Sequence, residues 1–175
     1  MKETKMYLQI ADYIRTSVVD GPGIRQVLFL SGCNFACKGC HNPKLQDFHY
    51  GKSMSITDVE KLFTFDKRIN RVTFTGGEPM EQAFVLEKLA TRLISKGVED
   101  ILIYSGYIIE EILSEGDENK IKLLKKCSTL IDGRFEISKK DLRLPFRGSA
   151  NQRIIDLRKI RSLLVNNPVS QVVRP

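Results

Sequence analysis

Short apolar runs alternate with longer amphipathic segments through most of the chain. Four runs rich in β-branched and aromatic residues predict buried strands at 26–31, 71–75, 100–105 and 128–132. Between and around them, apolar residues at helical spacing predict helices at 55–62, 84–96, 108–113 and 119–127. Ser55 or Thr57 is the expected cap of the first helix, and Gly97 is expected to end the second. The alternation is typical of an α/β fold with a parallel sheet and right-handed crossovers.

The two ends of the chain extend this pattern. Residues 7–15 predict a first short strand region, and 154–157 predict a terminal strand. From about residue 139 the chain becomes polar and charged, with few core positions, and 166–175 predict an irregular tail. The predicted strands are too few for a closed eight-stranded barrel. We therefore expect a single domain over residues 1–175, built as an open partial (β/α) barrel with a parallel sheet and outer helices.

Four segments with distinctive chemistry directly follow the predicted strands. They are a cysteine-rich loop that begins at Gly32, and the turns 76–79, 105–107 and 132–134. In parallel α/β proteins the carboxyl ends of the strands gather at one edge of the sheet, where ligands bind. We therefore expect the four segments to meet at one site.

The cysteine loop carries three thiols in the spacing C-x3-C-x2-C, at Cys33, Cys37 and Cys40. Gly32 and Gly39 allow the tight backbone turns that would bring the three sulfurs together. Iron–sulfur clusters are normally held by four cysteines, so three thiolates would leave one iron of a four-iron cluster open. An open coordination position is typical of a catalytic metal site.

Zinc remains the alternative metal for this loop. His41 or Cys127 would then complete the site, although zinc sites normally show two paired groups of ligands and only one group is present here. Cys127 lies on a helical pattern, which favours a buried structural thiol over a fourth ligand.

The turns at the other strand ends offer groups for a small ligand. The paired glycines Gly76 and Gly77 would let the backbone approach a ligand closely, and the carboxylate of Glu78 suits an ammonium group. An ordinary turn is the alternative interpretation of these residues. Asp132 could accept from hydroxyl or ammonium groups, and Arg134 could hold a carboxylate.

The net charge of the chain limits the kinds of partner that we expect. The 175 residues carry a formal net charge of +7, which favours an acidic protein or a phosphorylated substrate over a basic one. Lysines and arginines are spread along the chain and do not form a basic stripe with interleaved aromatics, so we expect no nucleic acid partner. We also expect a cytoplasmic protein without a membrane span, because no signal peptide or long apolar stretch is present.

The cysteine loop and the glycine pair together resemble the radical S-adenosylmethionine (SAM) superfamily. The segments Asp20–Arg25, Gly32–Cys33 and Cys40–Pro43 are similar to the glycyl-radical-enzyme activases. Residues 130–135 and 144–155 resemble one branch of these activases, the activating proteins of the anaerobic (class III) ribonucleoside-triphosphate reductase. The resemblance runs from about residue 13 to residue 157.

The resemblance implies a barrel of the radical SAM type and a role for each matching residue. Cys33, Cys37 and Cys40 would bind three irons of a [4Fe-4S] cluster, and the fourth iron would chelate the amino and carboxylate groups of SAM. The residues implied in SAM binding are Gly76, Gly77 and Glu78 for the methionine amino group, Gly39, Cys40, His41 and Asn42 for the adenine, and Asp132 as a strand-end acid.

The same resemblance implies two protein partners. They are the catalytic subunit of the anaerobic ribonucleotide reductase, which is a glycyl radical protein, and a flavodoxin-like reductant. The basic segment Lys139–Arg153 is a candidate for docking or for covering the site, or alternatively a structural wrap. Three other functions stay open: an activase of another glycyl radical enzyme, a different small radical SAM enzyme, and a non-enzymatic zinc or electron-transfer module.

Overall fold

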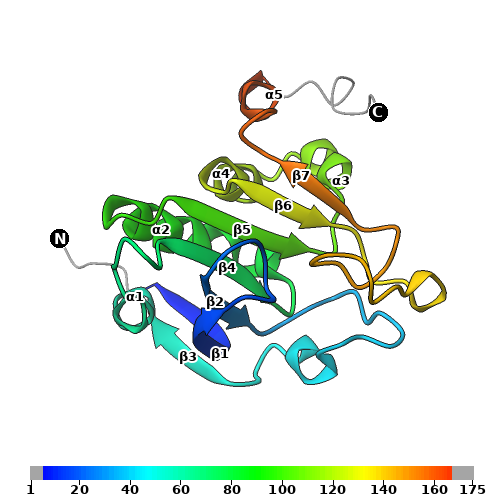
Figure 1. Cartoon of the computed structure of the whole chain (residues 1–175), viewed down its shortest axis with the longest axis horizontal. Coiled ribbons are helices and arrows are strands. Elements are labelled where there is room, and N and C mark those ends of the chain that lie inside the picture. The colour runs from blue at the N-terminus through cyan, green and yellow to red at the C-terminus, as the bar shows by residue number, and fades with distance from the viewer. Residues whose placement is uncertain (1–5, 167–175) are drawn as a thin grey trace.

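A mixed sheet forms the centre of the molecule (Figure 1). The structure is a computed structural model and describes residues 6–166. Within these residues the sheet has seven strands in the order β3-β1-β2-β4-β5-β6-β7. The strands are β1 (Tyr7–Ser17), β2 (Arg25–Leu30), β3 (Lys52–Ser55), β4 (Arg71–Gly76), β5 (Asp100–Ser105), β6 (Thr129–Asp132) and β7 (Arg153–Asp156).

The prediction of a parallel sheet is confirmed for the central strands and wrong for the margins. Strands β2, β4, β5 and β6 are mutually parallel. Strand β1 is antiparallel to both β2 and β3, and β7 is antiparallel to β6. The reason lies in the connections, because a strand that returns without a crossover helix must pair antiparallel with its neighbour. Strand β3 was not predicted from the sequence.

The helices follow the predicted positions closely. The α-helices are α1 (Ile56–Leu62), α2 (Ala83–Ser95), α3 (Ile109–Glu115), α4 (Glu118–Lys126) and α5 (Arg161–Asn166), and the 3-10 helices are η1 (Pro43–Gln46), η2 (Pro79–Gln82) and η3 (Ile137–Lys139). Ser55 is the cap of α1, since its side chain accepts a hydrogen bond from Asp58 N at 3.2 Å. Gly97 follows α2 with φ 103°. Helix α5 was not predicted. It includes Asn166, the first residue of the predicted irregular tail, and the rest of that tail, 167–175, lies outside the described residues.

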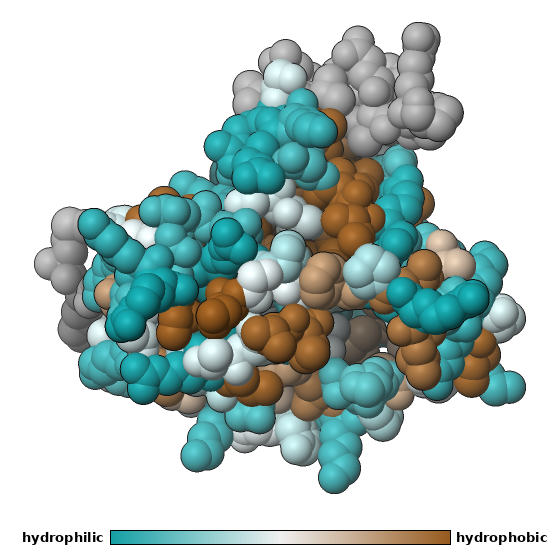
Figure 2. All heavy atoms as spheres, viewed as in Figure 1, coloured by the Kyte–Doolittle hydropathy of each residue, from teal (hydrophilic) through white to brown (hydrophobic). Residues whose placement is uncertain are grey.

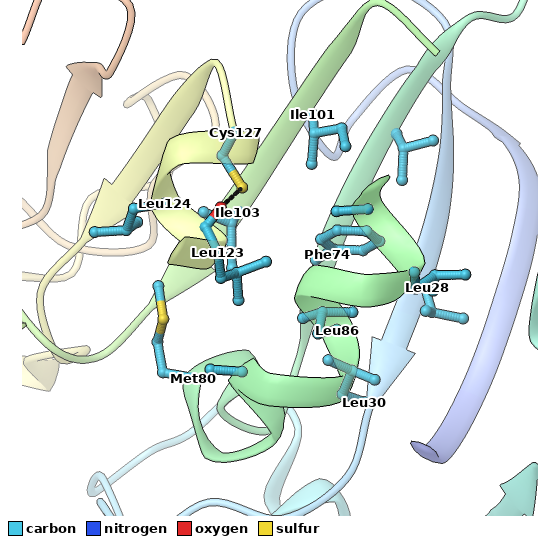
Figure 3. Packing of buried hydrophobic residues seen from close by; sticks show 14 of the residues in the cluster. Leu28, Leu30, Phe74, Met80, Leu86, Ile101, Ile103, Leu123, Leu124 and Cys127 are labelled. Carbon is cyan, nitrogen blue, oxygen red and sulfur yellow. Dashed lines mark hydrogen bonds between the residues drawn. The ribbon is translucent and has the colours of Figure 1, made fainter. Parts of the chain in front are cut away.

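The hydrophobic core lies between the sheet and the helices that cover one face of it. Helix α2 packs between α1 and α4 on this face. Alternate residues of the central strands, such as Leu28, Phe74 and Ile103, point toward Leu86 of α2 (Figure 3). Strand residues alternate between the two faces of a sheet, so these side chains lie on the face that the helices cover. Among the described residues, no helix combines the length and apolar character needed to cross a membrane.

The side chain of Arg25 joins neighbouring strands by hydrogen bonds at the end of the sheet opposite the cysteine loop. Its guanidinium is fully buried and donates to Thr73 Oγ1 at 2.7 Å, to Val72 O at 2.7 Å and to Asp100 Oδ1 at 2.8 Å. A further bond at 3.1 Å reaches the carbonyl of Pro22. The segment 20–25 therefore ties the amino ends of three parallel strands together and leaves their carboxyl ends for the site.

One face of the molecule carries a band of apolar residues across its middle, with polar residues around it (Figure 2). Large apolar side chains that remain exposed include Ile14, Val18, Val19 and Ile24, from β1 and the turn that follows it.

Candidate metal centre

The four strand-end segments meet at one edge of the sheet, as predicted. The cysteine loop follows β2, and the turns 76–79, 105–107 and 132–134 follow β4, β5 and β6. Leu30 is in register with Gly76, and Ser105 with Asp132, so the four parallel strands end at the same level. The sequence therefore predicted the convergence of these four segments correctly.

The backbone of the cysteine loop turns where the glycines allow it. Gly32 has φ 95° and Gly39 has φ 75°, which are conformations that glycine adopts readily. Ala36, between the first two cysteines, also has a positive φ of 47°. Cys40 N donates to Cys37 O at 3.1 Å, so the last two cysteines lie on one tight turn. The expected role of both glycines in the turns is confirmed.

Backbone hydrogen bonds hold the start of this loop in place. Gly32 N donates to Leu45 O at 2.8 Å, and Glu78 N donates to Gly32 O at 2.8 Å. Gly77 lies between these stretches of backbone, and a Cβ at that position would stand 2.5 Å from Gly32 O and 2.6 Å from Leu45 O. Only glycine fits there, so the glycine pair packs against the cysteine loop.

The three thiols of the loop are all half-buried and free. Burial raises the pKa of the Cys33 thiol, and the nearby charges of Glu78, Cys37 and Cys40 raise that pKa further. Within residues 6–166, no three His, Cys, Asp or Glu side chains already surround a common point at metal-binding distance. In kind and number, however, three soft thiolates on one loop fit a four-iron cluster with one open iron.

Glu78 is buried and hydrogen-bonded within the chain. Its Oε1 accepts from Met80 N at 2.9 Å and from Ser105 Oγ at 3.0 Å, and its Oε2 accepts from Gly106 N at 2.7 Å. Burial raises the pKa of Glu78 to about 7, although these hydrogen bonds lower it in part. The carboxylate joins the end of β4 to the end of β5.

Phe35 anchors the cysteine loop to the ends of β5 and β6. Its ring packs edge-on against Tyr107, with ring centroids 4.6 Å apart, and the guanidinium of Arg134 lies 4.5 Å from its centroid. Tyr107 Oη donates to Glu81 Oε1 at 2.8 Å, and Asn34 Nδ2 donates to Glu81 Oε2 at 3.0 Å. These contacts fix two residues between the first two cysteines, and they also engage Arg134 within the chain.

Asp132 is buried in an ion pair. Its carboxylate accepts from Arg153 Nε at 2.9 Å and Nη2 at 2.6 Å, and from Ile109 N at 2.9 Å at the start of α3. Arg153 also pairs with Glu110, and these two carboxylates raise the pKa of Arg153. The acid stands at the strand end, as expected, but its hydrogen bonds are made within the chain.

Cys127 lies at the other edge of the sheet. It follows α4 and precedes β6, whereas the cysteine loop follows the carboxyl end of β2. The thiol is fully buried and donates to Leu123 O at 3.4 Å (Figure 3). Burial raises its pKa far above the ordinary value. The prediction of a buried structural thiol is confirmed.

A pocket of about 440 Å³ lies beside the end of the cysteine loop. Its lining includes His41 and Asn42 from the loop, together with Ile14 and Phe29 from β1 and β2. Ligand pockets in proteins commonly have volumes of about 300 to 1,000 Å³. Two of the residues expected to face an adenine therefore line a space of suitable size.

Sequence reasoning missed the side chains that hold the loop. Phe35 and Glu81 were not singled out as site residues, and Tyr107 was predicted there only as part of the turn 105–107, although all three contact the loop or its anchor. One available signal was an aromatic residue between two cysteines in an otherwise polar loop, since such a ring needs a packing partner.

Comparison with known proteins also indicates an iron–sulfur site. Residues 19–155 match a family described as a 4Fe-4S single cluster domain. The chain is 35% identical over 156 residues to the anaerobic ribonucleoside-triphosphate reductase-activating protein of Pasteurella multocida (strain Pm70), and the match covers 84% of this chain and 96% of that protein. Proteins of the same name from Escherichia coli (strain K12) and from Enterobacteria phage T4 are 30% and 31% identical, and the matches cover 83% and 78% of this chain and 97% and 86% of those proteins.

The region matched by the family includes the cysteine loop and all four parallel strands. The chain therefore belongs to the family of anaerobic ribonucleoside-triphosphate reductase-activating proteins, with a 4Fe-4S single cluster domain.

Proposed function

We propose that this chain activates an anaerobic ribonucleoside-triphosphate reductase by forming a glycyl radical on its catalytic subunit. The relatives carry the activating function in their names, and the match spans nearly their whole length. The observation that carries the proposal is the trio of thiols on a loop packed against the glycine pair at the carboxyl ends of parallel strands.

The proposed cofactors are a [4Fe-4S] cluster and SAM. Cys33, Cys37 and Cys40 would hold three irons, because thiolates are the usual ligands of such clusters. When bound, the cluster supplies the electron that cleaves SAM into methionine and a 5′-deoxyadenosyl radical, which takes a hydrogen atom from a glycine of the reductase. The chain itself contributes binding, orientation and exclusion of water.

The chain's own groups support this placement of SAM. Gly76, Gly77 and Glu78 would hold the methionine amino group beside the loop, against which Gly77 packs. Gly39, Cys40, His41 and Asn42 would face the adenine, and the last two line the neighbouring pocket. Asp132 would act by holding its strand-end turn in place, because Arg153 and Ile109 already occupy its carboxylate.

The fold and the partners form part of the same proposal. The four parallel strands with helices on one face would be an open partial barrel of the radical SAM type, in a single domain over residues 1–175. A flavodoxin-like protein would deliver the electron. Asn34, Ala36 and Lys38 on the cysteine loop reach the surface and leave an approach for it.

Anaerobic reconstitution with iron and sulfide tests the proposal. After reduction, the loaded protein should convert SAM to 5′-deoxyadenosine, and it should form a radical on added reductase that is detected by electron paramagnetic resonance. Cys37→Ala should abolish both products. Formation of 5′-deoxyadenosine at the parental rate by this variant would show that the loop is assigned wrongly. Zinc without sulfide in the purified protein would favour the non-enzymatic alternative.

A further inference from the structure

An apolar side chain lies exposed against the cysteine loop. Ile137, in the short helix η3, is 51% exposed. A Cβ on Gly39 would lie 2.8 Å from Ile137 Cδ1, so this side chain rests on the loop between the second and third cysteines. Gly39 is also exposed, and Figure 1 shows the loop in light blue and η3 in yellow at the edge toward which β5 and β6 point. Ile137 and this part of the loop therefore belong to one accessible surface.

Three exposed basic residues accompany Ile137 on these two segments. Lys38 is exposed and precedes the glycine that Ile137 contacts. The Arg134 guanidinium lies 4.5 Å from the ring centroid of Phe35, in the same loop, and the arginine side chain is 51% exposed. Lys140 is exposed, and its backbone N–H donates to Ile137 O at 3.3 Å, which closes one turn and brings the two residues together. Together these residues form the basic patch, which consists of Lys38, Arg134, Ile137 and Lys140.

The positive charge of the basic patch is only partly compensated. Arg134 pairs with Glu111 at 3.3 Å, whereas Lys38 and Lys140 form no ion pair within residues 6–166. The whole segment 134–147 carries five basic and two acidic residues. A surface on which one sign of charge predominates attracts partners of the opposite sign and raises their rate of association. The basic patch therefore favours an acidic partner.

The basic patch does not coincide with the positions expected to hold SAM. None of its four residues lines the pocket whose walls include His41 and Asn42. The glycine pair and Glu78 also lie outside the basic patch. A protein bound there would contact the cysteine loop without needing to occupy these positions. This arrangement suits a partner that delivers electrons to the loop better than it suits the reductase, which must present a glycine to the bound SAM.

The size and composition of the basic patch also suit a transient partner. Electron-transfer complexes are commonly weak and bury less than about 1,200 Å² in total. Protein interfaces place apolar contacts at their centre and polar groups at the rim, and complementary charge sets specificity and association rate. Ile137 supplies the apolar contact here, and the basic side chains supply the charge. A small surface of this kind is therefore sufficient for an electron carrier.

We infer that the basic patch is the docking surface for an acidic one-electron carrier protein, which contacts Ile137 and places carboxylates against Lys38 and Lys140. The inference rests on the proposed function and adds to it the place at which the reductant binds. One electron passes from the reduced carrier to the iron–sulfur site, and no bond forms or breaks. The carrier leaves oxidised by one electron, and another reduced carrier can then bind.

Two reductants applied to the same reconstituted protein test the inference. Reduced flavodoxin has to dock, whereas dithionite is a small reductant that needs no docking surface. With flavodoxin at low ionic strength, Lys140→Glu should raise the half-saturating concentration for 5′-deoxyadenosine formation about threefold to tenfold, because it replaces an attraction with a repulsion at an exposed site. With excess dithionite the variant should react at the parental rate.

Two further variants separate the effect of charge from that of apolar contact. Lys159→Glu is the matched control, because it reverses the charge of an exposed lysine that follows β7, at the end of the sheet opposite the cysteine loop. This control should match the parental protein with both reductants. At about 1 M salt, where the Debye length is about 3 Å, the defect of Lys140→Glu should largely disappear. Ile137→Ser should also require more flavodoxin, and its defect should persist in salt.

Direct binding gives a readout that does not depend on catalysis. Calorimetric titration of the protein with oxidised flavodoxin at low ionic strength should give a dissociation constant that rises for Lys140→Glu by a similar factor. Equal binding and equal half-saturation for this variant and the parental protein would overturn the inference. A variant that uses flavodoxin normally but needs more reductase for radical formation would also overturn it, since the basic patch would then bind the reductase.

Failure of the inference can be told apart from failure of the proposed function. If the parental protein cleaves SAM with dithionite but the variants of the basic patch use flavodoxin as well as the parental protein does, only the docking role is lost. If the parental protein cleaves SAM with neither reductant, the proposed function fails and the inference fails with it.

Discussion

The ring of Phe35 lies directly over Gly106. A Cβ on this glycine would stand 2.5 Å from two ring carbons, far inside van der Waals contact. The cysteine loop therefore rests on the end of β5, and its position depends on the lack of a side chain there.

Gly106→Ala should displace Phe35 and loosen the loop. We expect a loss of about 1 to 3 kcal/mol in the free energy of unfolding, as for other overpacked sites, together with reduced iron and sulfide after reconstitution. Gly116→Ala is the control, because Gly116 has a positive φ but no described atom lies within 4 Å of the position that its Cβ would take. It should lose stability through strain yet bind the full cluster. A fully loaded Gly106→Ala protein would contradict the prediction.

The Cys127→Ala variant should show that this thiol has a structural role, in contrast to the proposed metal-binding role of the three thiols on the loop. The side chain is fully buried, so its removal should cost about 1 to 2 kcal/mol of unfolding free energy. Iron and sulfide per chain should stay at the parental value, since the thiol lies at the opposite edge of the sheet. Cys33→Ala is the comparison and should lose the cluster. Loss of iron from Cys127→Ala without unfolding would instead support a fourth protein ligand.

The free energy of unfolding should depend on pH because the pKa of the buried Glu78 is raised. Burial raises its pKa from the ordinary 4.5 to about 7, so the folded state holds a proton that the unfolded state releases. The resulting stabilisation is complete below about pH 4.5 and is lost as the pH rises through 7, with a full size on the order of 3 kcal/mol.

Urea unfolding of the parental protein and of Glu78→Gln between about pH 5 and pH 8 measures this effect. The parental protein should lose stability relative to the variant across this range, because the amide does not titrate. A constant difference between the two proteins would show that the carboxyl group has an ordinary pKa.

Asp132 and Arg153 should behave as a coupled pair. Arg153→Met leaves a fully buried carboxylate with its bond from Ile109 N, and we expect a loss of about 2 kcal/mol, since Arg153 itself is 44% exposed. Adding Asp132→Asn should restore part of that loss, as measured by chemical unfolding. Additive single effects in this double-mutant cycle would argue against the ion pair.

Arg25→Met should destabilise the amino end of the sheet. The guanidinium is fully buried, and its loss leaves Asp100 and several acceptors unpaired, which should cost about 3 kcal/mol or more. Arg68→Ala removes an ion pair to Asp66 whose arginine side chain is 87% exposed, and it should change stability by less than about 1 kcal/mol. Equal unfolding midpoints for the two variants would refute this account of Arg25.

Periodicity and turn chemistry alone located the helices, the central strands and the edge of the sheet where the site lies. The continuous apolar runs at 27–30 and 101–103 mark strands that are buried on both faces, and such a run is visible from neighbours close in the sequence. The same local logic placed Cys33, Cys37 and Cys40 on one loop after a strand. The spacing of three thiols and the two flanking glycines needed no information from the rest of the chain.

Contacts between distant segments decided the remainder. The antiparallel margins of the sheet depend on how β1 and β7 return, and the acids Glu78 and Asp132 are engaged by donors 28 and 21 residues away. Phe35 meets Gly106, and Phe135 meets Gly39 and Gly148, only once the strands are assembled. A side chain's partners across the fold leave no periodic trace in the sequence, because packing and hydrogen bonding act through space. The sequence therefore determined which groups stand at the site, and the tertiary structure decided which of them remain available to a ligand.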